Sequence, residues 1–385
     1  MMRIYRFELK KLLSSVAVWG FLAACLSVNM AFVCNSRDPY GDFIGTVSKQ
    51  TGYVLNNDFY DKLSKLTVEK AHADYLERLK IETENVEDVF EGYNAKRIGE
   101  RYIEAAKLEG IFAEAMRHKY TRLQKVTDEK AKNDESLSLY FAGSTYYRHQ
   151  FLFNDLIGVL LTEGALASVL LALLAAGYEG IYRTENLVYS SKKGREILRP
   201  KLFASLSAGV MFYALLAFIT FLVYFGINDF GGIGKSFVSS VFNYRIDLIA
   251  GDRPFITWQS FTVQTYLLAV LFVGAGIVLC FSLMAFGIGV FVRNSYISFF
   301  LFLIANAATL ALPLQMPLNS IGYAVISVIV LSPVTLWLKH GLWFTDGDID
   351  IVWTHFETLG LFVSLVVLTA FCLLALHYFR KRNLT

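Results

Sequence analysis

The sequence predicts an all-α integral membrane protein with six transmembrane helices, a re-entrant segment between the last two, and a helical extracellular insertion between the first two. Three observations predict this fold class. Of the 385 residues, 55% are hydrophobic and 15% aromatic, and only 18% are charged, against about 25% in an average soluble protein. Several apolar runs reach the roughly 20 residues that cross a bilayer. One long polar segment, residues 35–152, separates the first run from the others.

The chain begins with a short basic, amphipathic stretch. Residues 1–13 combine four cations with leucine and aromatic residues, a mixture typical of a helix at the inner membrane surface. Residues 14–34 follow as the first predicted span. Leu22–Cys25 resembles a lipoprotein cleavage site. The apolar run continues to Val33, however, and this favours an uncleaved anchor.

Residues 35–152 are expected to form a helical domain outside the cell. Two stretches, 58–91 and 95–132, read as helical, and apolar residues in the second recur at spacings of three, four and seven. An antiparallel hairpin that turns near residues 92–94 is therefore predicted. The segment follows a span that starts inside, and long loops translocate largely regardless of charge. We interpret it as a packed helical cap, with a gating or partner-binding domain as the alternative.

The rest of the chain divides according to its apolar runs. In order, we expect a second span at 153–177, a cytosolic coupling loop or helix at 178–201, a third span at 202–227, an external loop at 228–261, a fourth span at 262–292, a fifth span at 296–312, an external re-entrant region at 313–356, a sixth span at 357–379 and a cytosolic tail at 380–385. Ser168, Ala172 and Ala176 are spaced by four, which predicts close helix packing in lipid. A full crossing at 321–338 would place the basic C-terminus outside. A broken or re-entrant helix is therefore preferred there, and Pro333 is consistent with it.

Positive charge sets the predicted orientation. The segments expected inside carry fourteen Lys and Arg residues, whereas the two shorter external loops carry four. The positive-inside rule therefore places both termini in the cytosol.

The loop at 178–201 is more elaborate than a turn requires. Six cations are interspersed with acidic residues. Arg183 and Arg195 have the forked guanidinium that pairs with carboxylates, and Tyr182 offers an apolar anchor. We therefore predict that the loop docks another protein, with topogenic charge alone as the alternative.

Glu163 lies inside the second apolar run. At 1.5 Å per residue it is about 15 Å from the start of that run, where a carboxylate costs about 2.5–3.5 kcal/mol on insertion scales. No Lys or Arg lies in the apolar runs. Proton relay, substrate contact and a packing role all remain open for Glu163. Asn306 is a weaker candidate of the same kind, more typical of a satisfied polar group.

Two further patterns indicate ordinary loops. Residues 231–236, GGIGKS, resemble a phosphate loop, but Asp229 stands where that pattern needs glycine. Asp346, Asp348 and Asp350 lack the longer ligand set and bidentate Glu of a calcium loop, so a solvated turn is favoured.

We expect no catalytic residue, metal site or cofactor bound by this chain. The four cysteines lie in or beside apolar runs without disulfide or zinc spacing. The net charge of +3 gives no reason to expect nucleic acid as a partner.

Together these features resemble the permease subunit of a type-2 ABC exporter. Members begin with an amphipathic helix such as FELKKLL, have six spans, and carry a coupling loop after the second. The degenerate motif of that loop is matched by Glu179, Glu185, Gly194–Arg195 and Lys201. The resemblance covers residues 1–34 and 153–382 and departs at the large insertion. Within the class, the chain looks most like Gram-positive permeases tied to antimicrobial-peptide or cell-envelope stress.

The resemblance implies a mechanism in two kinds of chain. Separate ABC ATPase subunits would bind ATP and Mg²⁺, and their closure would reorient two permeases, identical or different, in the bacterial plasma membrane. The cargo would be a peptide, lipid or other amphiphile. The coupling residues would be Glu179, Tyr182, Arg183, Glu185, Arg195 and Lys201.

Two other functions remain open. The first is a membrane sensor or scaffold whose outer domain binds a ligand or partner without transport. The second is a proton-driven carrier that uses Glu163, although the inverted halves of many such carriers are not evident.

Overall fold

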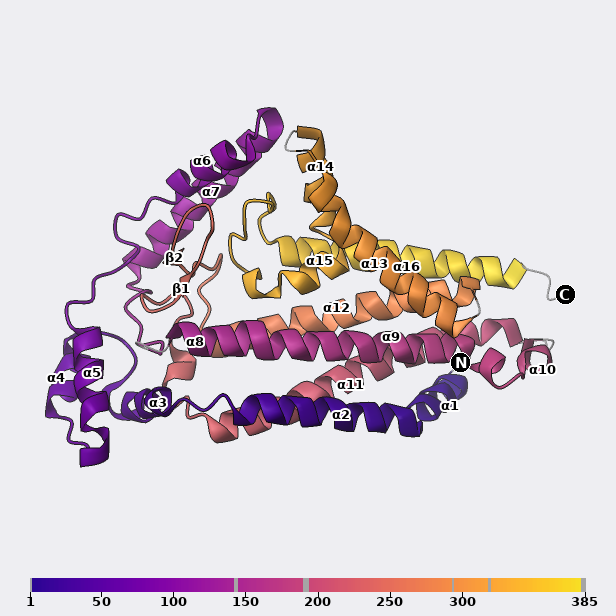
Figure 1. Ribbon diagram of the computed structural model, residues 1–385, viewed down its shortest axis with the longest axis horizontal. Coiled ribbons are helices and arrows are strands. Elements are labelled where there is room, and N and C mark those ends of the chain that lie inside the picture. Colours follow the sequence, from indigo (N-terminus) through magenta and orange to yellow (C-terminus); the bar gives the residue numbers. More distant parts are fainter. Residues whose placement is uncertain (1, 142–144, 190–193, 293, 318–319, 382–385) are drawn as a thin grey trace.

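The computed structural model describes residues 2–141, 145–189, 194–292, 294–317 and 320–381. Figure 1 shows long helices lying side by side. Both termini and α10 (Glu185–Tyr189) lie at one end, called the terminal end below. Helices α3 to α7 lie at the other, the domain end.

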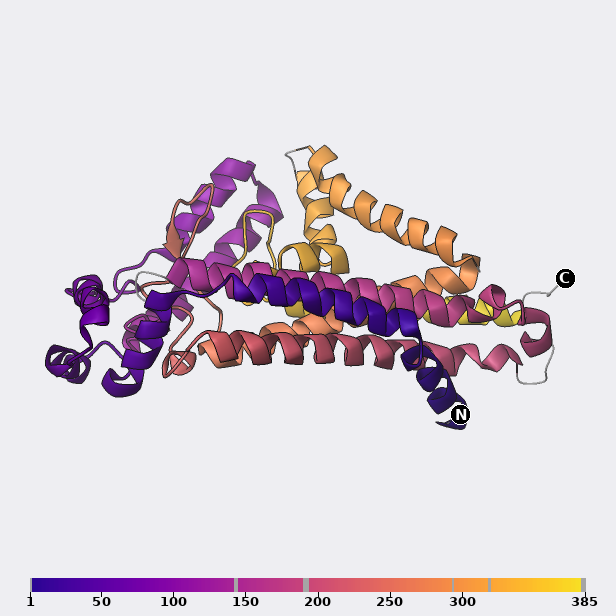
Figure 2. The same cartoon turned by 60° about the horizontal axis from the view of Figure 1, so that its bottom comes forward.

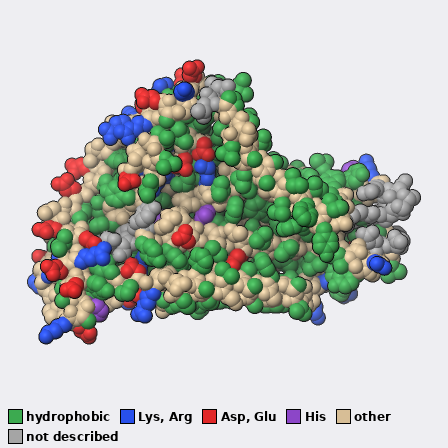
Figure 3. All heavy atoms as spheres, viewed as in Figure 1, with side chains coloured by type: hydrophobic (Ala, Val, Ile, Leu, Met, Phe, Trp, Pro, Cys, Tyr) green, Lys and Arg blue, Asp and Glu red, His purple; other side chains and the backbone are tan. Residues whose placement is uncertain are grey.

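Among the described residues, six helices are long and apolar enough to cross a membrane, which agrees with the predicted all-α membrane protein. They are α2 (Val16–Cys34), the helix Tyr147–Ile181 that contains α9 (Ile157–Ile181), α11 (Leu198–Ile227), α12 (Val263–Val292), α13 (Ser295–Gln315) and α16 (Phe356–Lys381). Figure 3 shows hydrophobic side chains over much of this bundle, whereas charged side chains gather at the domain end. Such a distribution suits a protein that contacts lipid along the bundle.

Helix α9 lies at the centre of the bundle. It packs most extensively against α11 and α12, and it also touches α2 and α13. The predicted small-residue stripe lies on its packed face, since Ser168 and Ala172 are fully buried. A Cβ added at Gly209 of α11 would lie 3.0 Å from the Cβ of Ser168. Small side chains thus let the two backbones approach closely.

Helix α1 (Met2–Leu13) joins α2 at an angle, as Figure 2 shows. It packs against α11 and α9. The hydroxyl of Tyr5 donates a hydrogen bond to Ser207 Oγ at 3.0 Å, and Leu12 is buried. The predicted N-terminal helix is therefore present and is attached to the bundle along one side.

The domain end holds five α-helices and a 3₁₀ turn ahead of α8. They are α3 (Pro39–Thr51), α4 (Asn57–Lys65), η1 (Lys70–His72), α5 (Ala73–Thr83), α6 (Ala95–Ala106) and α7 (Gly110–Lys132). Helix α8 (Thr145–His149) follows them. A helical hairpin exists, but its predicted place is wrong. Helices α6 and α7 pair with each other and turn at Lys107–Glu109, whereas the stretch 58–91 divides into α4 and α5. The break occurs because Lys107 adopts the left-handed conformation, with φ 51°, and so ends α6.

The helix leading into α9 contains a π-helical segment, η2 (Gln150–Leu156). Such segments are rare and are often found at functional sites. Here η2 packs against η5 (His340–Leu342), a short 3₁₀ turn in the segment between α13 and α16.

Between α13 and α16 the chain forms two short helices, α14 (Ser320–Ile329) and α15 (Pro333–Leu338). Ser332 caps α15, because its Oγ accepts from the Thr335 amide, and Pro333 occupies the first turn. Neither helix has the length of a span. The predicted fifth span, 296–312, is too short at its end, because α13 continues through Pro313 to Gln315.

Two further turns complete the domain end. The strands β1 (Tyr244–Arg245) and β2 (Arg253–Pro254) pair in antiparallel fashion, and η4 (Ile233–Lys235) precedes them. The glycine-rich segment is a packing loop. A Cβ at Gly231, where φ is 43°, would lie 1.7 Å from the carbonyl oxygen of Gly45, and the amide of Gly232 donates to Ser48 Oγ at 3.1 Å. Its glycines therefore serve close contact with α3.

Candidate coupling segment and polar sites

The chain between α9 and α11, residues 182–197, is called the coupling segment below. A buried ion pair joins its two ends. Glu179 near the end of α9 accepts from Nζ of Lys201 in the first turn of α11, and the two side chains are 4% and 0% exposed. The ammonium also donates to the carbonyl oxygen of Ala175 at 3.1 Å. Removing one partner of such a pair costs about 3–5 kcal/mol, because the other charge stays buried. The pair therefore fixes the ends of α9 and α11 relative to each other.

Two neighbouring elements are attached to the same carboxylate. Nζ of Lys11 in α1 lies 3.6 Å from Glu179 and 3.2 Å from the ring centroid of Tyr178. The hydroxyl of Tyr189 in α10 donates to Glu179 at 3.3 Å. A single buried carboxylate thus organises α1, α9, α10 and α11 at the terminal end.

The outward part of the coupling segment is a tight turn followed by α10. Tyr182 is 59% exposed, and its ring lies 4.4 Å from that of Tyr178. Arg183 is exposed and adopts a left-handed conformation, with φ 55°. Glu185 begins α10, and Arg195 lies in η3 (Gly194–Glu196); of these two residues the structure describes the backbone alone.

The six residues predicted for coupling therefore separate into groups. Glu179 and Lys201 face each other inside the protein, so they support the segment and are not exposed to a partner. Tyr182 and Arg183 lie on the surface at the turn. Two further cations of the loop, Lys192 and Lys193, lie outside the described residues.

Glu163 belongs to a polar cluster inside the bundle. Its Oε2 accepts from Asn29 Nδ2 at 2.9 Å, and the same amide group lies 3.2 Å from Thr220 Oγ1. Within the described chain no Lys or Arg forms an ion pair with this carboxylate. The cluster connects α2, α9 and α11 without neutralising the charge.

Asn306, the other predicted intramembrane polar residue, lies elsewhere. Its Nδ2 donates to the carbonyl oxygen of Phe302 at 2.8 Å, within α13. It is 3.7 Å from the sulfur of Met284. Glu163 and Asn306 thus do not form one site, and Asn306 is satisfied by its own helix.

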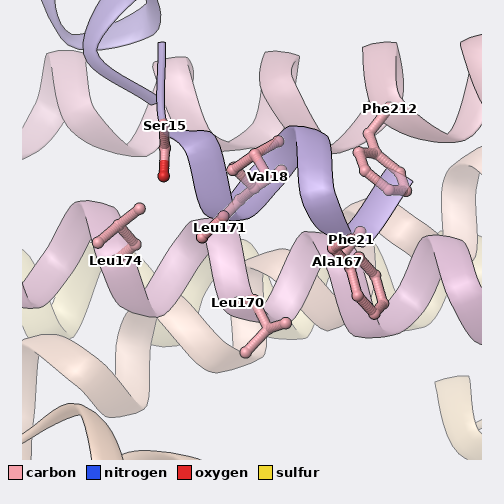
Figure 4. Close-up of a pocket in the computed structure, with 9 residues that line it drawn as sticks. Ser15, Val18, Phe21, Ala167, Leu170, Leu171, Leu174 and Phe212 are labelled. Carbon is pink, nitrogen blue, oxygen red and sulfur yellow. The ribbon is translucent and has the colours of Figure 1, made fainter. Parts of the chain in front are cut away.

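An apolar cavity of about 230 Å³ opens between α2, α9 and α11. Side chains of all three helices line it, among them Phe21, Leu171 and Phe212 (Figure 4). Ser15, at the bend between α1 and α2, supplies its only polar side chain. The cavity suits an acyl chain or another apolar group.

A buried charge network at the domain end was not predicted. Asp346 is 1% exposed and accepts from Arg253 Nη1 at 2.7 Å and from the Tyr120 hydroxyl at 2.7 Å. Arg253 also bonds to Asp247, which accepts from the Tyr102 hydroxyl. The predicted solvated turn is therefore wrong at Asp346, because Arg253 supplies its counter-ion. The network joins the hairpin α6–α7 to the β1–β2 turn and to the loop before α16.

Burial and charge shift two ionisation equilibria in this network. Burial alone would raise the pKa of Asp247, but the amides of Ile249 and Ala250, the Tyr102 hydroxyl and Arg253 together lower it to about 2. Burial lowers the pKa of Lys119 to about 8, although Asp346 opposes the shift. Nζ of Lys119 donates to the carbonyl oxygen of Ile351 at 2.5 Å. Asp247 thus stays ionised, whereas burial destabilises the charged form of Lys119.

Comparison of the chain with protein-family models, with curated proteins and with solved structures found no match.

Proposed function

We propose that this chain is the membrane-spanning subunit of an ATP-driven exporter in the bacterial plasma membrane, and that a separate ATPase subunit acts on it through the coupling segment. The buried pair of Glu179 and Lys201 carries the proposal. A docking element can move helices only if it is firmly attached to them, and this pair attaches it to both α9 and α11. The exposed Tyr182 and Arg183 offer an aromatic face and a forked cation to a partner.

In this proposal the terminal end faces the cytosol. Basic residues of α1, of the coupling segment and of the end of α16 gather there, which agrees with the positive-inside rule. The hairpin α6–α7 and its charge network then lie outside. Helices α14 and α15 enter from the outside and return, covered on one side by α13 and α12.

The ATPase is placed on another chain because this one offers no suitable phosphate loop. Its glycine-rich segment packs against α3 and lies at the domain end. The apolar cavity between α2, α9 and α11 supports an amphiphile as cargo. A second permease, identical or different, would complete the path, and a role in resistance to antimicrobial peptides is part of this proposal.

The decisive experiment is purification of the full chain from its own membrane, followed by identification of co-purifying chains and measurement of ATP hydrolysis. We expect an ATPase to accompany the wild type. Tyr182→Ala and Arg183→Glu should reduce its recovery, because both side chains are exposed at the turn. Glu104→Gln, an exposed change in α6 at the domain end, should leave recovery unchanged. Absence of any ATPase, or equal recovery with all variants, would refute the proposed coupling.

The native thiols allow a separate test of orientation. Cys34 at the end of α2 is exposed, whereas Cys25, Cys280 and Cys372 are buried. A membrane-impermeant maleimide should therefore label Cys34 in intact cells. The double variant Cys34→Ser, Tyr182→Cys should react only after the cells are opened. The reverse pattern would invert the proposed topology.

A sensor or scaffold is the second candidate function, and the charge network favours it because it connects the outer hairpin rigidly to the bundle. A sensor predicts that a ligand binds the full chain while ATP turnover by any associated subunit stays unchanged. Ligand-stimulated turnover would instead favour transport.

A further inference from the structure

A cavity of about 450 Å³ lies along α9 beside Glu163. Its wall is formed by α9, by Phe32 of α2 and by residues of α15 and η5. The volume is within the roughly 300–1,000 Å³ of small-molecule sites and is too small for a folded peptide. A second cavity, of about 490 Å³, adjoins it and shares Asn154, Leu338 and His340. The two cavities therefore lie next to each other on the side of the domain end.

Two carboxylates line the first cavity. Asp155 is exposed near the rim, and Glu163, 9% exposed, lies deeper in the bundle. Eight residues of helix separate them by about 12 Å. Among the described residues, no Lys or Arg lines the first cavity. Two cations line the adjoining cavity, and both form ion pairs with protein carboxylates. Lys339 pairs with Asp350 at 2.9 Å, and Arg245 pairs with Asp348 at 3.0 Å.

The aromatic wall is held in place before any ligand arrives. The indole of Trp337 donates to Thr162 Oγ1 at 3.2 Å, and the Thr162 hydroxyl donates to the Gly158 carbonyl at 2.7 Å. His340 lies between two carbonyl oxygens, those of Trp337 at 2.9 Å and Asn154 at 2.8 Å. A Cβ at Gly158 would lie 3.0 Å from the His340 ring, so glycine is needed for this contact. Such a fixed wall lowers the entropy lost on binding.

We propose that this cavity binds a small lipophilic cation, an amine or quaternary ammonium with one positive charge and an apolar body. The carboxylate of Glu163 pairs with the ligand's positive charge, Trp337 and Phe32 supply aromatic faces, and Asp155 attracts the cation at the entrance. The buried carboxylate keeps its hydrogen bond from Asn29 and gains an ion pair. That the bound cation is also the cargo rests on the proposed function, whereas binding itself does not.

The test measures equilibrium binding of radiolabelled tetraphenylphosphonium to the purified full chain in detergent, with tetraphenylborate as the matched anion. We expect saturable binding of the cation and none of the anion. Glu163→Gln keeps shape and hydrogen bonding but removes the charge, so it should weaken binding about tenfold or more. Asp155→Asn, at an exposed position that does not threaten folding, should weaken it about threefold through lost attraction at the entrance. Glu104→Gln should bind as the wild type does.

Equal binding of cation and anion, or unchanged affinity in both Glu163→Gln and Asp155→Asn, would overturn the site. If Glu163→Gln fails to fold, Asp155→Asn and the anion still decide the outcome. The assay contains no ATPase, so its failure is distinct from failure of the proposed coupling. If the cation binds but no ATPase co-purifies with the chain, the proposed site is supported and the proposed exporter function is refuted.

Discussion

Replacement of Asp346 by asparagine tests the buried network most directly. The substitution removes the charge that faces Arg253 Nη1 at 2.7 Å, in a place where the side chains of Asp346 and Arg253 are 1% and 3% exposed. Removing one partner of a buried ion pair costs about 3–5 kcal/mol. Asp348→Asn is the matched control: Asp348 also contacts Arg245, but its side chain is 43% exposed. Loss of such an exposed partner costs at most about 1 kcal/mol.

The assay is thermal unfolding of the purified chain, combined with limited tryptic cleavage at Lys107 in the α6–α7 turn. At roughly 2–4 °C per kcal/mol, a loss of about 3 kcal/mol lowers the midpoint by about 6–12 °C. Asp346→Asn should therefore unfold much earlier than Asp348→Asn and be cleaved faster. Adding Arg253→Met should restore part of the loss, because the unpaired guanidinium is removed and Asp247, which then loses Arg253, keeps Arg245 as its counter-ion. Equal midpoints for the two asparagine variants would refute the reasoning that burial makes this network strong.

Three further predictions concern other buried groups. Lys201→Met should lower the free energy of unfolding by about 3 kcal/mol, measured by thermal unfolding, and adding Glu179→Gln should recover most of it; no recovery would contradict a direct pair. Lys119→Met should stabilise the protein near neutral pH, because burial lowers the pKa of that ammonium to about 8 from 10.5. The unfolded chain binds more protons between these values, so wild-type stability rises with pH in that window and the advantage of the variant shrinks; a constant difference in denaturation midpoints from about pH 7 to pH 10 would exclude this cause. Gly209→Val should cost about 1–3 kcal/mol by overpacking, since its Cβ would lie 3.0 Å from that of Ser168, and Ser168→Gly should relieve it in a measurement of stability and yield.

The long helices could be predicted because an apolar run of span length has few alternatives to a membrane helix. Their ends could not. The polar residues predict that the second span ends at residue 177 and that the third span begins at residue 202. In the structure α9 continues to Ile181, and α11 already begins at Leu198. Glu179 and Lys201 neutralise each other and can therefore be buried in helix. A single sequence does not reveal that pairing.

The network at the domain end was missed for a related reason. Alternating aspartates are typical of a solvated turn, and the counter-ion of Asp346 lies 93 residues away in the chain. The hairpin turn was misplaced because the helical spacing continues across Lys107, a residue type that rarely adopts the left-handed conformation. Of the predicted polar sites, Glu163 does face a cavity, and the sequence signal for it was its lone charge in an apolar run.

The buried pair of Glu179 and Lys201 at the base of the coupling segment has a mechanical consequence. A loop joined loosely to two helices would absorb a push by bending, and the helices would stay where they are. Here the Glu179–Lys201 contact closes the base of the loop, so bending it there means separating two buried charges. A force on Tyr182 is therefore passed on as a tilt of the α9–α11 pair as one rigid body, with α1 carried along through Lys11. In the proposed coupling to an ATPase, the segment would therefore move together with the two helices and would not bend at its base.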